Sequence, residues 1–561
     1  MRSIFKVGLV GMLCGATMAA GAALVHFDTV PYQMAKKAVR VVFPKAPPPP
    51  PTAEDVPEVQ TGDAEQATFE SILVELRSEA VTIPRSRAGT GGALTPAEGG
   101  VILLTHDGLM YHATGPDDVT GLKIQAPENG FLDYSEDAEG RFSDLKHMLR
   151  NFRYNDILLV DRAEGRQLYA SFTRYFQEDA CFVNAIARLD LPAGSVRDAE
   201  APASAWETVF EAAPCLPLKP HSLALEGHMA GGRMAYDGES TIYLGSGDYH
   251  FDGSSHSPDL VISNDDSYEY GKVMALNIDT QETRMLSRGN RNMQGVAWLD
   301  GEVYVVEHGA RGGDELNRIR DGGHYGWPFV SLGTAYNKQP QPGTINYGRH
   351  DDYDKPVFSW LPSIAISSLN PIEGVHESWD GDLLMGSLKA QSLFRIRLEG
   401  DRVLFAEQIP VGARVRYAQP LEDRIVLWTD GRKLMFVTLE PFAAEDPVEK
   451  ALKANGVAGD DAKRLAGNFL ACRECHAVNP DDNYAAPTLA NVFGAPIAGG
   501  AYADYSDALR AKGGVWDREA LTAYLTDPES FASGTIMPGQ GLSAEAVSDM
   551  ITVLEALSAA N

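Results

Sequence analysis

The sequence predicts an all-β six-bladed β-propeller followed by a small all-α domain, with a transmembrane helix at the N-terminus. Three observations lead to this prediction. A turn followed by a short aliphatic run recurs six times between about residues 68 and 440. A Cys-x-x-Cys-His motif, followed by apolar residues at helical spacing, lies within residues 441–561. A long apolar run begins at residue 7.

The N-terminal segment has the composition of a signal peptide or a membrane anchor. Arg2 and Lys6 precede an apolar stretch from Val7 to Val25, whose length is close to that needed to span a bilayer. No clean small-residue cleavage site closes this stretch, so we expect an uncleaved anchor over residues 1–27 rather than a cleaved signal peptide. Residues 28–67 contain six consecutive positions from Ala46 to Pro51 of which five are proline, which predicts a semi-rigid linker.

Residues 68–440 are predicted to form the propeller. Each copy of the recurring motif has a polar turn and then a short aliphatic run, which is the pattern of a buried strand bounded by turns. Six copies at long, uneven spacing favour six blades with loops of variable length, although repetition this loose also arises by chance in all-β proteins. The copies lie at residues 98–104, 155–160, 237–244, 300–306, 380–385 and 422–428.

Polar residues and glycines follow several of these copies. If the copies are equivalent strands, their C-terminal ends meet at one end of the channel, where a ligand site is expected; an ordinary solvated rim is the alternative. Arg414 and Arg416 face the same way in an extended segment, and with Arg291 and Lys389 they form a cationic set. Such a set suits an anionic, planar polycarboxylate, although a surface arginine pair often has no ligand.

A c-type haem attachment motif opens the C-terminal domain, in Cys472-Arg473-Glu474-Cys475-His476. Both thiols can bond a haem vinyl group, and the His476 imidazole is then held under the iron. A redox Cys-x-x-Cys and half of a zinc site are the alternatives, but the chain after His476 has no further Cys or His to complete a zinc site. Met537 is the candidate for the sixth iron ligand, a ligation that raises the haem potential for electron transfer.

The chain has 561 residues, a net charge of −29 and five cysteines. Its acidic surface argues against nucleic acid or an anionic membrane surface as a ligand. Covalent haem attachment implies an oxidising compartment, the bacterial periplasm, where a disulfide between Cys181 and Cys215 is permitted. Two buried thiols are the alternative.

The C-terminal domain resembles class I cytochrome c from about residue 450 to residue 561. The resemblance is carried by the haem motif, by Ala486-Pro487-Thr488-Leu489, by Tyr505, and by Trp516, which fall in the order of that family. It implies that the Pro487 backbone orients the His476 imidazole and that Tyr505 and Trp516 hydrogen-bond a haem propionate. Ala495 departs from the family, in which many members carry an arginine near the propionates.

Residues 220–440 resemble the soluble sugar dehydrogenases that use pyrroloquinoline quinone (PQQ), the glucose/sorbosone and aldose sugar dehydrogenase family. Residues 68–220 match only in their general propeller character. The segments that carry the resemblance are Gly231-Gly232-Arg233, Gly247-Asp248, Arg291-Asn292-x-Gln294-Gly295, Glu307-His308-Gly309, Gly313-Asp314-Glu315-Leu316-Asn317, Tyr325-Gly326-Trp327-Pro328, Pro362-Ser363, Ser387-Leu388-Lys389 and Arg414-x-Arg416.

The resemblance implies a role for each matching position. The PQQ carboxylates and carbonyls would be bound by Arg291, Asn292, Gln294, Lys389, Arg414 and Arg416. The backbone carbonyls of Gly309 and Ala310 would hold Ca²⁺. His228 would be the general base and Asp248 would orient it, although the family places the histidine one residue nearer to the Gly-Arg pair.

Together these patterns predict a membrane-tethered periplasmic quinohaemoprotein. It would oxidise an aldose at C1 by hydride transfer to PQQ and pass the electrons through haem c to a respiratory acceptor. Two alternatives stay open: the same cofactors with a non-sugar alcohol as substrate, and a propeller that binds a ligand without catalysis beside an electron-transfer cytochrome. A lactone hydrolase ranks last, because it needs neither haem nor the cationic set.

Overall fold

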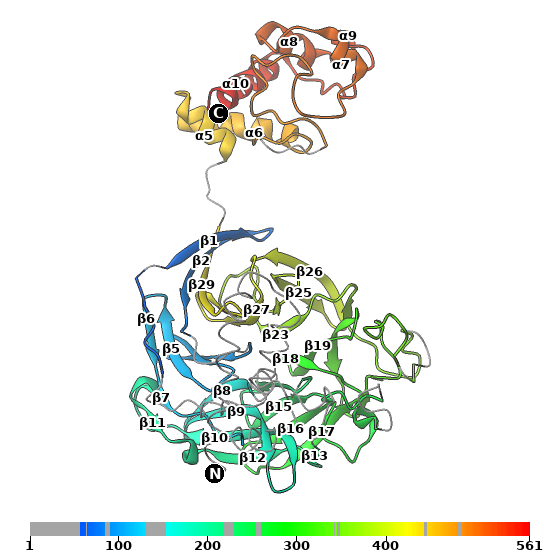
Figure 1. The fold of residues 1–561 in the computed structure, drawn as a ribbon. Helices are drawn as coiled ribbons and strands as arrows, with labels where there is room; N and C mark the ends of the chain where they lie inside the picture. Colours follow the sequence, from blue (N-terminus) through cyan, green and yellow to red (C-terminus); the bar gives the residue numbers. More distant parts are fainter. Residues whose placement is uncertain are drawn as a thin grey trace, which may run out of the picture. The chain divides into compact units, whose positions relative to one another are not determined.

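The computed structural model describes residues 56–560, except 63, 85–89, 131–152, 218–227, 254–259, 342, 345–347, 442–445 and 481–484. The chain divides into two compact units, Met1–Glu440 and Pro441–Asn561 (Figure 1). The expected anchor over residues 1–27 lies outside the described residues. Among the helices that the structure describes, none has both the length and the apolar content to cross a bilayer.

The first unit contains six sheets, each running from an innermost to an outermost strand, and their described pairs are antiparallel except for one short outer strand that pairs in parallel. We call each sheet a blade and name it by its innermost strand. The β3 blade contains β3 (Ala93–Ala97), β4 (Gly100–Leu104), β5 (Met110–Gly115) and β6 (Asp118–Gly121). The β8 blade contains β8 (Tyr154–Arg162), β9 (Gly165–Phe176), β10 (Cys181–Asp190), β12 (Glu207–Glu211) and β13 (Leu216–Pro217). The β14 blade contains β14 (Gly231–Tyr236), β15 (Thr241–Ser246), β16 (Lys272–Asn277), β17 (Thr283–Arg288) and β21 (Gly323–His324).

The remaining three blades follow in chain order. The β18 blade contains β18 (Met293–Leu299), β19 (Glu302–Glu307), β20 (Asp314–Ile319) and β22 (Phe358–Trp360). The β23 blade contains β23 (Ile366–Pro371), β24 (Leu383–Ser387), β25 (Ser392–Glu399) and β26 (Arg402–Pro410). The β27 blade contains β27 (Val415–Pro420), β28 (Ile425–Thr429), β29 (Lys433–Pro441), β2 (Val74–Thr82) and β1 (Glu65–Glu70). A short parallel pair, β7 (Lys123–Ile124) and β11 (Glu200–Ala201), lies outside the blades. Three 3₁₀ turns, Val196–Asp198, Ala203–Ala205 and Ile262–Asn264, lie in the connections.

The six innermost strands pack against one another in a closed ring. The order is β3, β8, β14, β18, β23 and β27, and β27 packs back onto β3. The last blade joins both ends of the unit, because β2 from the N-terminal side pairs beside β29. This ring confirms the predicted six-bladed propeller (Figure 1). The propeller begins at β1, slightly before the predicted start at residue 68.

The recurring sequence motif is the hairpin between the first and second strands of a blade. In the β3 and β18 blades the turns are Glu98-Gly99 and Asp300-Gly301, and all four residues have positive φ. Consecutive positive φ values give the type I′ turn that matches the twist of a two-residue hairpin. Five of the six copies therefore lead into the second strand of their blade.

The copy at residues 155–160 was assigned to the wrong strand. It falls on β8, which is an innermost strand, and the equivalent of the other copies is β9, which is antiparallel to β8. The error arose because β8 is as apolar as a second strand: Ile157 and Val160 are buried. The carboxyl end of β8 therefore lies at the opposite end of the channel from those of the other five copies.

Five innermost strands begin with a β-bulge. The pairing with the second strand shifts between Tyr154 and Asp156, Gly231 and Arg233, Met293 and Gly295, Ile366 and Ser368, and Val415 and Tyr417. In each case one residue is left without a partner, and a bulge of this kind bends the strand and re-aims the side chain. The five bulge residues are Asn155, Gly232, Gln294, Ser367 and Arg416.

The predicted disulfide is present between Cys181 on β10 and Cys215 before β13. The two Cα atoms are 5.7 Å apart, and the bridge ties β13 to the blade in which it pairs. Apolar side chains fill the spaces between neighbouring blades, as in the cluster that joins Leu103, Phe172 and Trp428 from three different blades.

The second unit is all-helical, as predicted. Its helices are α5 (Pro447–Ala454), α6 (Gly459–Arg473), α7 (Asp507–Lys512), α8 (Arg518–Thr526), α9 (Pro528–Phe531) and α10 (Ala544–Ala560). The predicted last helix is α10, and it buries Val547, Met550, Ile551, Leu554 and Leu557. This face packs on α6, where Leu465 and Phe469 are buried, and also on α5 and α8.

Candidate functional site

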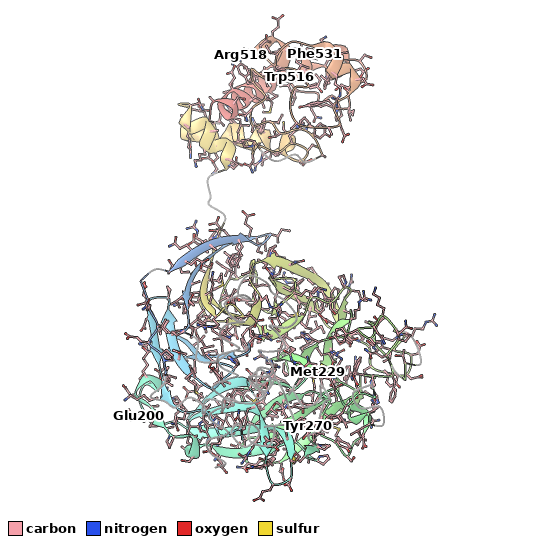
Figure 2. The ribbon with its side chains drawn as sticks, viewed as in Figure 1. Glu200, Met229, Tyr270, Trp516, Arg518 and Phe531 are labelled. Atoms are coloured by element: carbon pink, nitrogen blue, oxygen red, sulfur yellow. A yellow bond between two sulfur atoms is a disulfide. The ribbon has the colours of Figure 1, made fainter. Side chains whose placement is uncertain are left out.

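The bulges assemble the predicted ligand-binding residues at one end of the channel, which we call the mouth. Gln294 and Arg416 are themselves bulge residues, of the β18 and β27 blades. Asn292 and Arg414 stand two positions before them in the chain. The mouth is therefore lined by residues that precede or begin the innermost strands, together with the loops that follow the second strands. Met229, which follows His228, lies toward the centre of the ring in Figure 2.

Arg414 and Arg416 meet at a single carboxylate. Arg416 donates from Nε and Nη2 to the two oxygens of Asp430, at 2.9 and 3.1 Å, and Arg414 Nε donates to Asp430 Oδ2 at 3.0 Å. Arg414 Nη1 also donates to the Leu388 carbonyl at 3.2 Å, which brings it beside Lys389. Lys389 is exposed and makes no ion pair in the part of the chain that the structure describes. The predicted pair of arginines thus forms, but Asp430 neutralises part of its charge.

Arg291 lies between an aromatic ring and two carbonyls. Its guanidinium stacks 4.8 Å from the ring centroid of Trp327, and Nη1 donates to the carbonyls of His308 and Gly309 at 3.0 and 3.2 Å. Arg291 is 3% exposed, and its buried Nε has no hydrogen-bond partner. A guanidinium held in this way keeps an unused donor, which fits an anionic or carbonyl-bearing ligand.

Asn292 and Gln294 form a polar relay beside Arg291. Gln294 Nε2 donates to Asn292 Oδ1 at 2.9 Å, and the Asn292 amide lies 3.4 Å from His308 Nδ1. Burial lowers the pKa of His308, so the ring is neutral at neutral pH. His308 belongs to the Glu307-His308-Gly309 motif, and no role was predicted for it from the sequence. The contacts show that it orients the Asn292 amide.

Asp248 is fully buried beside the segment that carries His228. Its carboxylate accepts hydrogen bonds from the Trp327 indole at 2.7 Å and the His250 amide at 3.0 Å. Backbone hydrogen bonds from Gly247 to Ala230 and from Tyr249 to Met229 place it directly against the turn that begins at His228. Burial, followed by the charge of Asp252, raises the pKa of Asp248 to about 7.

His228 lies just before β14 and is partly buried. Its ring centroid is 6.3 Å from that of His250, in an edge-to-face arrangement. The structure thus brings His228, Asp248 and the cationic residues to the same end of the channel. The assignment of His228 as the general base, with Asp248 orienting it, stays a prediction.

The haem motif lies at the end of α6, and its geometry fits covalent attachment. His476 Nδ1 lies 2.7 Å from the Pro487 carbonyl, which fixes that nitrogen as the donor and leaves Nε2 for iron. Burial lowers the pKa of His476 and favours the neutral imidazole that a metal requires. The thiols of Cys472 and Cys475 are free. Cys472 and Met537 border the same apolar cluster.

The predicted propionate partners occupy different surroundings. Trp516 is buried and its ring stacks on Phe531 at 5.7 Å and tilts against Tyr524 at 5.0 Å (Figure 2). Tyr505 packs edge-to-face on Tyr502, with Arg510 6.0 Å from its ring centroid. Whether Tyr505 and Trp516 contact a haem propionate stays a prediction.

The model of the Glucose / Sorbosone dehydrogenase family matches residues 155–436, half of the chain. This chain belongs to the glucose/sorbosone dehydrogenase family. The matched residues begin at the bulge of the β8 blade and end on β29, so they include every residue that was predicted to bind PQQ or to take part in catalysis. The predicted resemblance is thereby confirmed.

Different known proteins match the propeller and the helical unit. The chain is 25% identical over 323 residues to the aldose sugar dehydrogenase YliI of Escherichia coli, covering 55% of this chain and 78% of that one. It is 29% identical over 255 residues to an uncharacterized protein of Synechocystis, of which it spans only 60%. The C-terminal part is 37% identical over 99 residues to cytochrome c 2.1 of Caenorhabditis briggsae, covering 18% of this chain and 88% of that one.

Among solved structures, the soluble aldose sugar dehydrogenase of E. coli in its apo-form matches with a TM-score of 0.49 and 22% identity. The match covers 63% of this chain and 96% of that one. The family match and the cytochrome c relative show that the chain joins a propeller of the glucose/sorbosone dehydrogenase family to a cytochrome c domain.

Two of the predicted cofactors find suitable groups in this chain. The unused donor of Arg291 and the exposed ammonium of Lys389 suit a polycarboxylate quinone, and His476 with its two thiols suits haem c. The Gly309 carbonyl already accepts a hydrogen bond from Arg291. The described residues also contain no group of three or more His, Cys, Asp or Glu side chains that could hold a metal ion.

Sequence reasoning missed three further residues of the mouth. Trp327 joins Asp248 to Arg291, and Asp430 joins Arg414 to Arg416. Arg153 stands two positions before the bulge residue Asn155. The signal for Arg153 was present, because the spacing Arg-x-Asn repeats that of Asn292-x-Gln294 and Arg414-x-Arg416. It was overlooked because residues 155–160 were assigned to the wrong strand.

Arg233 has a structural role at the axis of the propeller. It donates to the carbonyls of Asn155, Gly92 and Ser367 from three other blades, at 2.9, 3.4 and 3.3 Å. Its guanidinium also covers the Tyr417 ring at 4.8 Å. This buried arginine closes the channel below the mouth.

Proposed function

We propose that this protein is a PQQ-dependent dehydrogenase that oxidises an aldose at C1 and passes the electrons to its own haem c. The observation that carries the proposal is the set of cationic and amide side chains gathered at the mouth, at the same end of the channel as Asp248 and the turn of His228. The family match and the cytochrome c domain support the same chemistry. Members of the family that are named for their activity act on sugars, as the name of the E. coli relative states.

The residues of the mouth would have two roles: some would bind the cofactor, and others would transfer a proton. Arg291, Lys389, Arg414 and Arg416 would bind the cofactor carboxylates, and Asn292 and Gln294 would bind its carbonyls. His228 would take the proton of the C1 hydroxyl, held by the negative charge of Asp248. Bound PQQ supplies the acceptor for the hydride that leaves C1, so that the sugar loses two electrons and two protons and becomes a lactone.

The cytochrome c domain would carry the electrons onward one at a time. His476 and Met537 would hold the haem iron, and Cys472 and Cys475 would bond the haem covalently. A respiratory cytochrome or oxidase would be the final acceptor. The protein would lie in the bacterial periplasm, because haem attachment and the disulfide both need an oxidising compartment. The anchor predicted over residues 1–27 would tether it to the membrane. Ca²⁺ at the Gly309 and Ala310 carbonyls stays part of the proposal, without a chemical step of its own.

Haem reduction tests the proposed function. The soluble part is produced with a cytochrome c maturation system, supplied with Ca²⁺ and PQQ, and mixed with a panel of aldoses and simple alcohols while the haem absorption band is followed. We expect rapid aldose-dependent reduction that requires PQQ and is lost in Lys389→Ala. If PQQ does not bind and no substrate reduces the haem, the proposal is wrong. Reduction by simple alcohols alone would exclude the sugar as substrate.

Trp327→Phe should change the pH dependence of turnover without changing quinone binding. Phenylalanine keeps an aromatic face for Arg291 but removes the indole N–H that donates to Asp248. Loss of a hydrogen bond to a carboxylate raises the carboxylate pKa, so we expect the acidic limb of kcat to move up by about one pH unit. Trp327→Leu is the matched variant, because it removes the ring as well and should also weaken PQQ binding. A loss of kcat that is equal at every pH would contradict this role.

A further inference from the structure

We propose that Arg153 binds a carboxylate on the sugar, and that the enzyme therefore oxidises an acidic aldose of the uronic acid class. This inference rests on the proposed function and names its substrate class. It is carried by the position of Arg153 in the ring of bulges, by its contacts, and by the distribution of charge in the mouth.

Arg153 occupies in the β8 blade the position that Arg414 occupies in the β27 blade. Each stands two residues before its bulge residue, Asn155 in one blade and Arg416 in the other. Asn292 holds the same position before Gln294 in the β18 blade. Because two of these three equivalent positions carry residues expected to bind the ligand, the third is also placed to face it.

The contacts of Arg153 tie it to the blade of the proposed base. Arg153 Nε donates to Asn155 Oδ1 at 3.3 Å. Asn155 in turn lies so close to Gly232 that a Cβ atom added to this glycine would stand 2.5 Å from the Cβ of Asn155. Gly232 follows His228 by four residues, and β8 packs directly against β14. A sugar that presents C1 to His228 therefore has the Arg153 blade as its neighbour.

Arg153, like Arg291, is an arginine of the mouth that forms no ion pair with a carboxylate among the described residues. Arg414 and Arg416 share Asp430, and Arg233 has Asp156 at 3.4 Å. Arg153 makes no ion pair with any residue in the described ranges. Burial, then Arg416 and Arg233, lower its pKa to about 10, so it keeps its charge at neutral pH. A partly buried guanidinium without an anion is costly, and a ligand carboxylate would offset that cost.

Two ligands could supply this carboxylate, the quinone and the sugar. The residues predicted to bind the quinone lie just before or at the start of β18 and β27, or follow β24, and none of them lies on the β8 or β14 blade. The β8 blade adjoins the blade of His228 instead. This arrangement favours the sugar.

The test compares uronic acids with their neutral parents. Kinetic constants for glucuronate against glucose, and galacturonate against galactose, are measured with the PQQ-loaded wild type, Arg153→Gln and Arg162→Gln. Arg162 is the matched control, because it lies at the far end of β8 and pairs with Asp279. We expect the wild type to prefer the uronates, and Arg153→Gln to lose about 10- to 100-fold in kcat/KM for uronates alone. Calorimetric binding of glucuronate should weaken to the same extent, while PQQ titration of the apoprotein should be unchanged.

The other outcomes overturn the assignment in distinguishable ways. A tenfold weaker PQQ affinity in Arg153→Gln with an unchanged uronate-to-neutral ratio would assign the carboxylate to the quinone. Equal use of uronates and neutral sugars by the wild type would also contradict the inference. If no sugar is oxidised although PQQ binds, the proposed function fails, and calorimetry still decides whether Arg153 binds a uronate.

Discussion

Turnover should fall by about 10²- to 10⁴-fold when Asp248 is replaced by asparagine, the range over which a positioned acid–base group contributes to catalysis. Asparagine has nearly the same shape and can keep the contacts to the Trp327 indole and the His250 amide, but it carries no charge. The variant thus removes the negative charge beside the His228 turn without removing the side chain. The measurement is kcat for an aldose with saturating PQQ.

The pH dependence of the wild type follows from the same carboxylate. Burial and Asp252 raise the pKa of Asp248 to about 7, so this group is protonated below pH 7 and ionised above it. Because the proposed role needs the charge, kcat should rise with pH up to about 7 and then level off. The free energy of unfolding should change in the opposite direction, because a carboxyl group with a raised pKa stabilises the fold at acidic pH. This stabilisation by Asp248 is lost as the pH rises through about 7.

Two controls make the Asp248 prediction decisive. PQQ affinity should be unchanged in Asp248→Asn, because Arg291 keeps its contacts with Trp327 and with the carbonyls of His308 and Gly309. The acidic limb of the pH profile should disappear or move in the variant. A variant that turns over at the wild-type rate with the same limb would show that Asp248 only supports the fold.

The second large effect is expected from Cys472→Ser combined with Cys475→Ser. This double variant cannot attach haem, so reduction of an external one-electron acceptor cytochrome should fall to background. Aldose oxidation measured with a small redox dye should keep most of its rate, because Cys472 and Cys475 belong to the second unit and the mouth belongs to the first. A haem stain of the denatured protein checks the attachment.

Met537→Ala is the comparison for the double variant. It keeps both thiols and the His476 ligand, and should therefore keep the covalent haem but lower its potential, because a Met ligand opposite His raises that potential. Electron transfer to the acceptor should then slow without loss of the haem stain. If the double cysteine variant still reduces the acceptor cytochrome, the haem is not on the electron path and the fusion needs another explanation.

The sequence allowed the fold to be predicted because its signals are local. Turn residues such as Asp300-Gly301, followed by Val303–Val306, specify a hairpin without reference to the remainder of the chain. The Cys-x-x-Cys-His motif and the periodic apolar face of α10 are equally local. The pairing of Cys181 with Cys215 could be predicted because few other cysteines were available.

The mouth could be predicted only in part, because its contacts join distant segments. Trp327 donates to Asp248, and Asp430 accepts from two arginines, because of how the blades are placed around the axis. No periodic pattern in the sequence indicates contacts of this kind. The assignment of residues 155–160 failed for a related reason. In a propeller both the first and the second strand of a blade are buried on two faces, so their hydrophobic patterns are the same.

The bulges have a consequence for how this family can change. Below each bulge the pairing is regular again, as from Arg233 with Gly245 onward to Tyr236 with Ile242. A residue inserted or deleted before the bulge alters the rim of the mouth, but the spacing of the buried residues within the blade stays the same. The one-residue displacement of His228 expected from the resemblance would be a change of this kind. The rim of the mouth can therefore change while the packing between neighbouring blades stays the same.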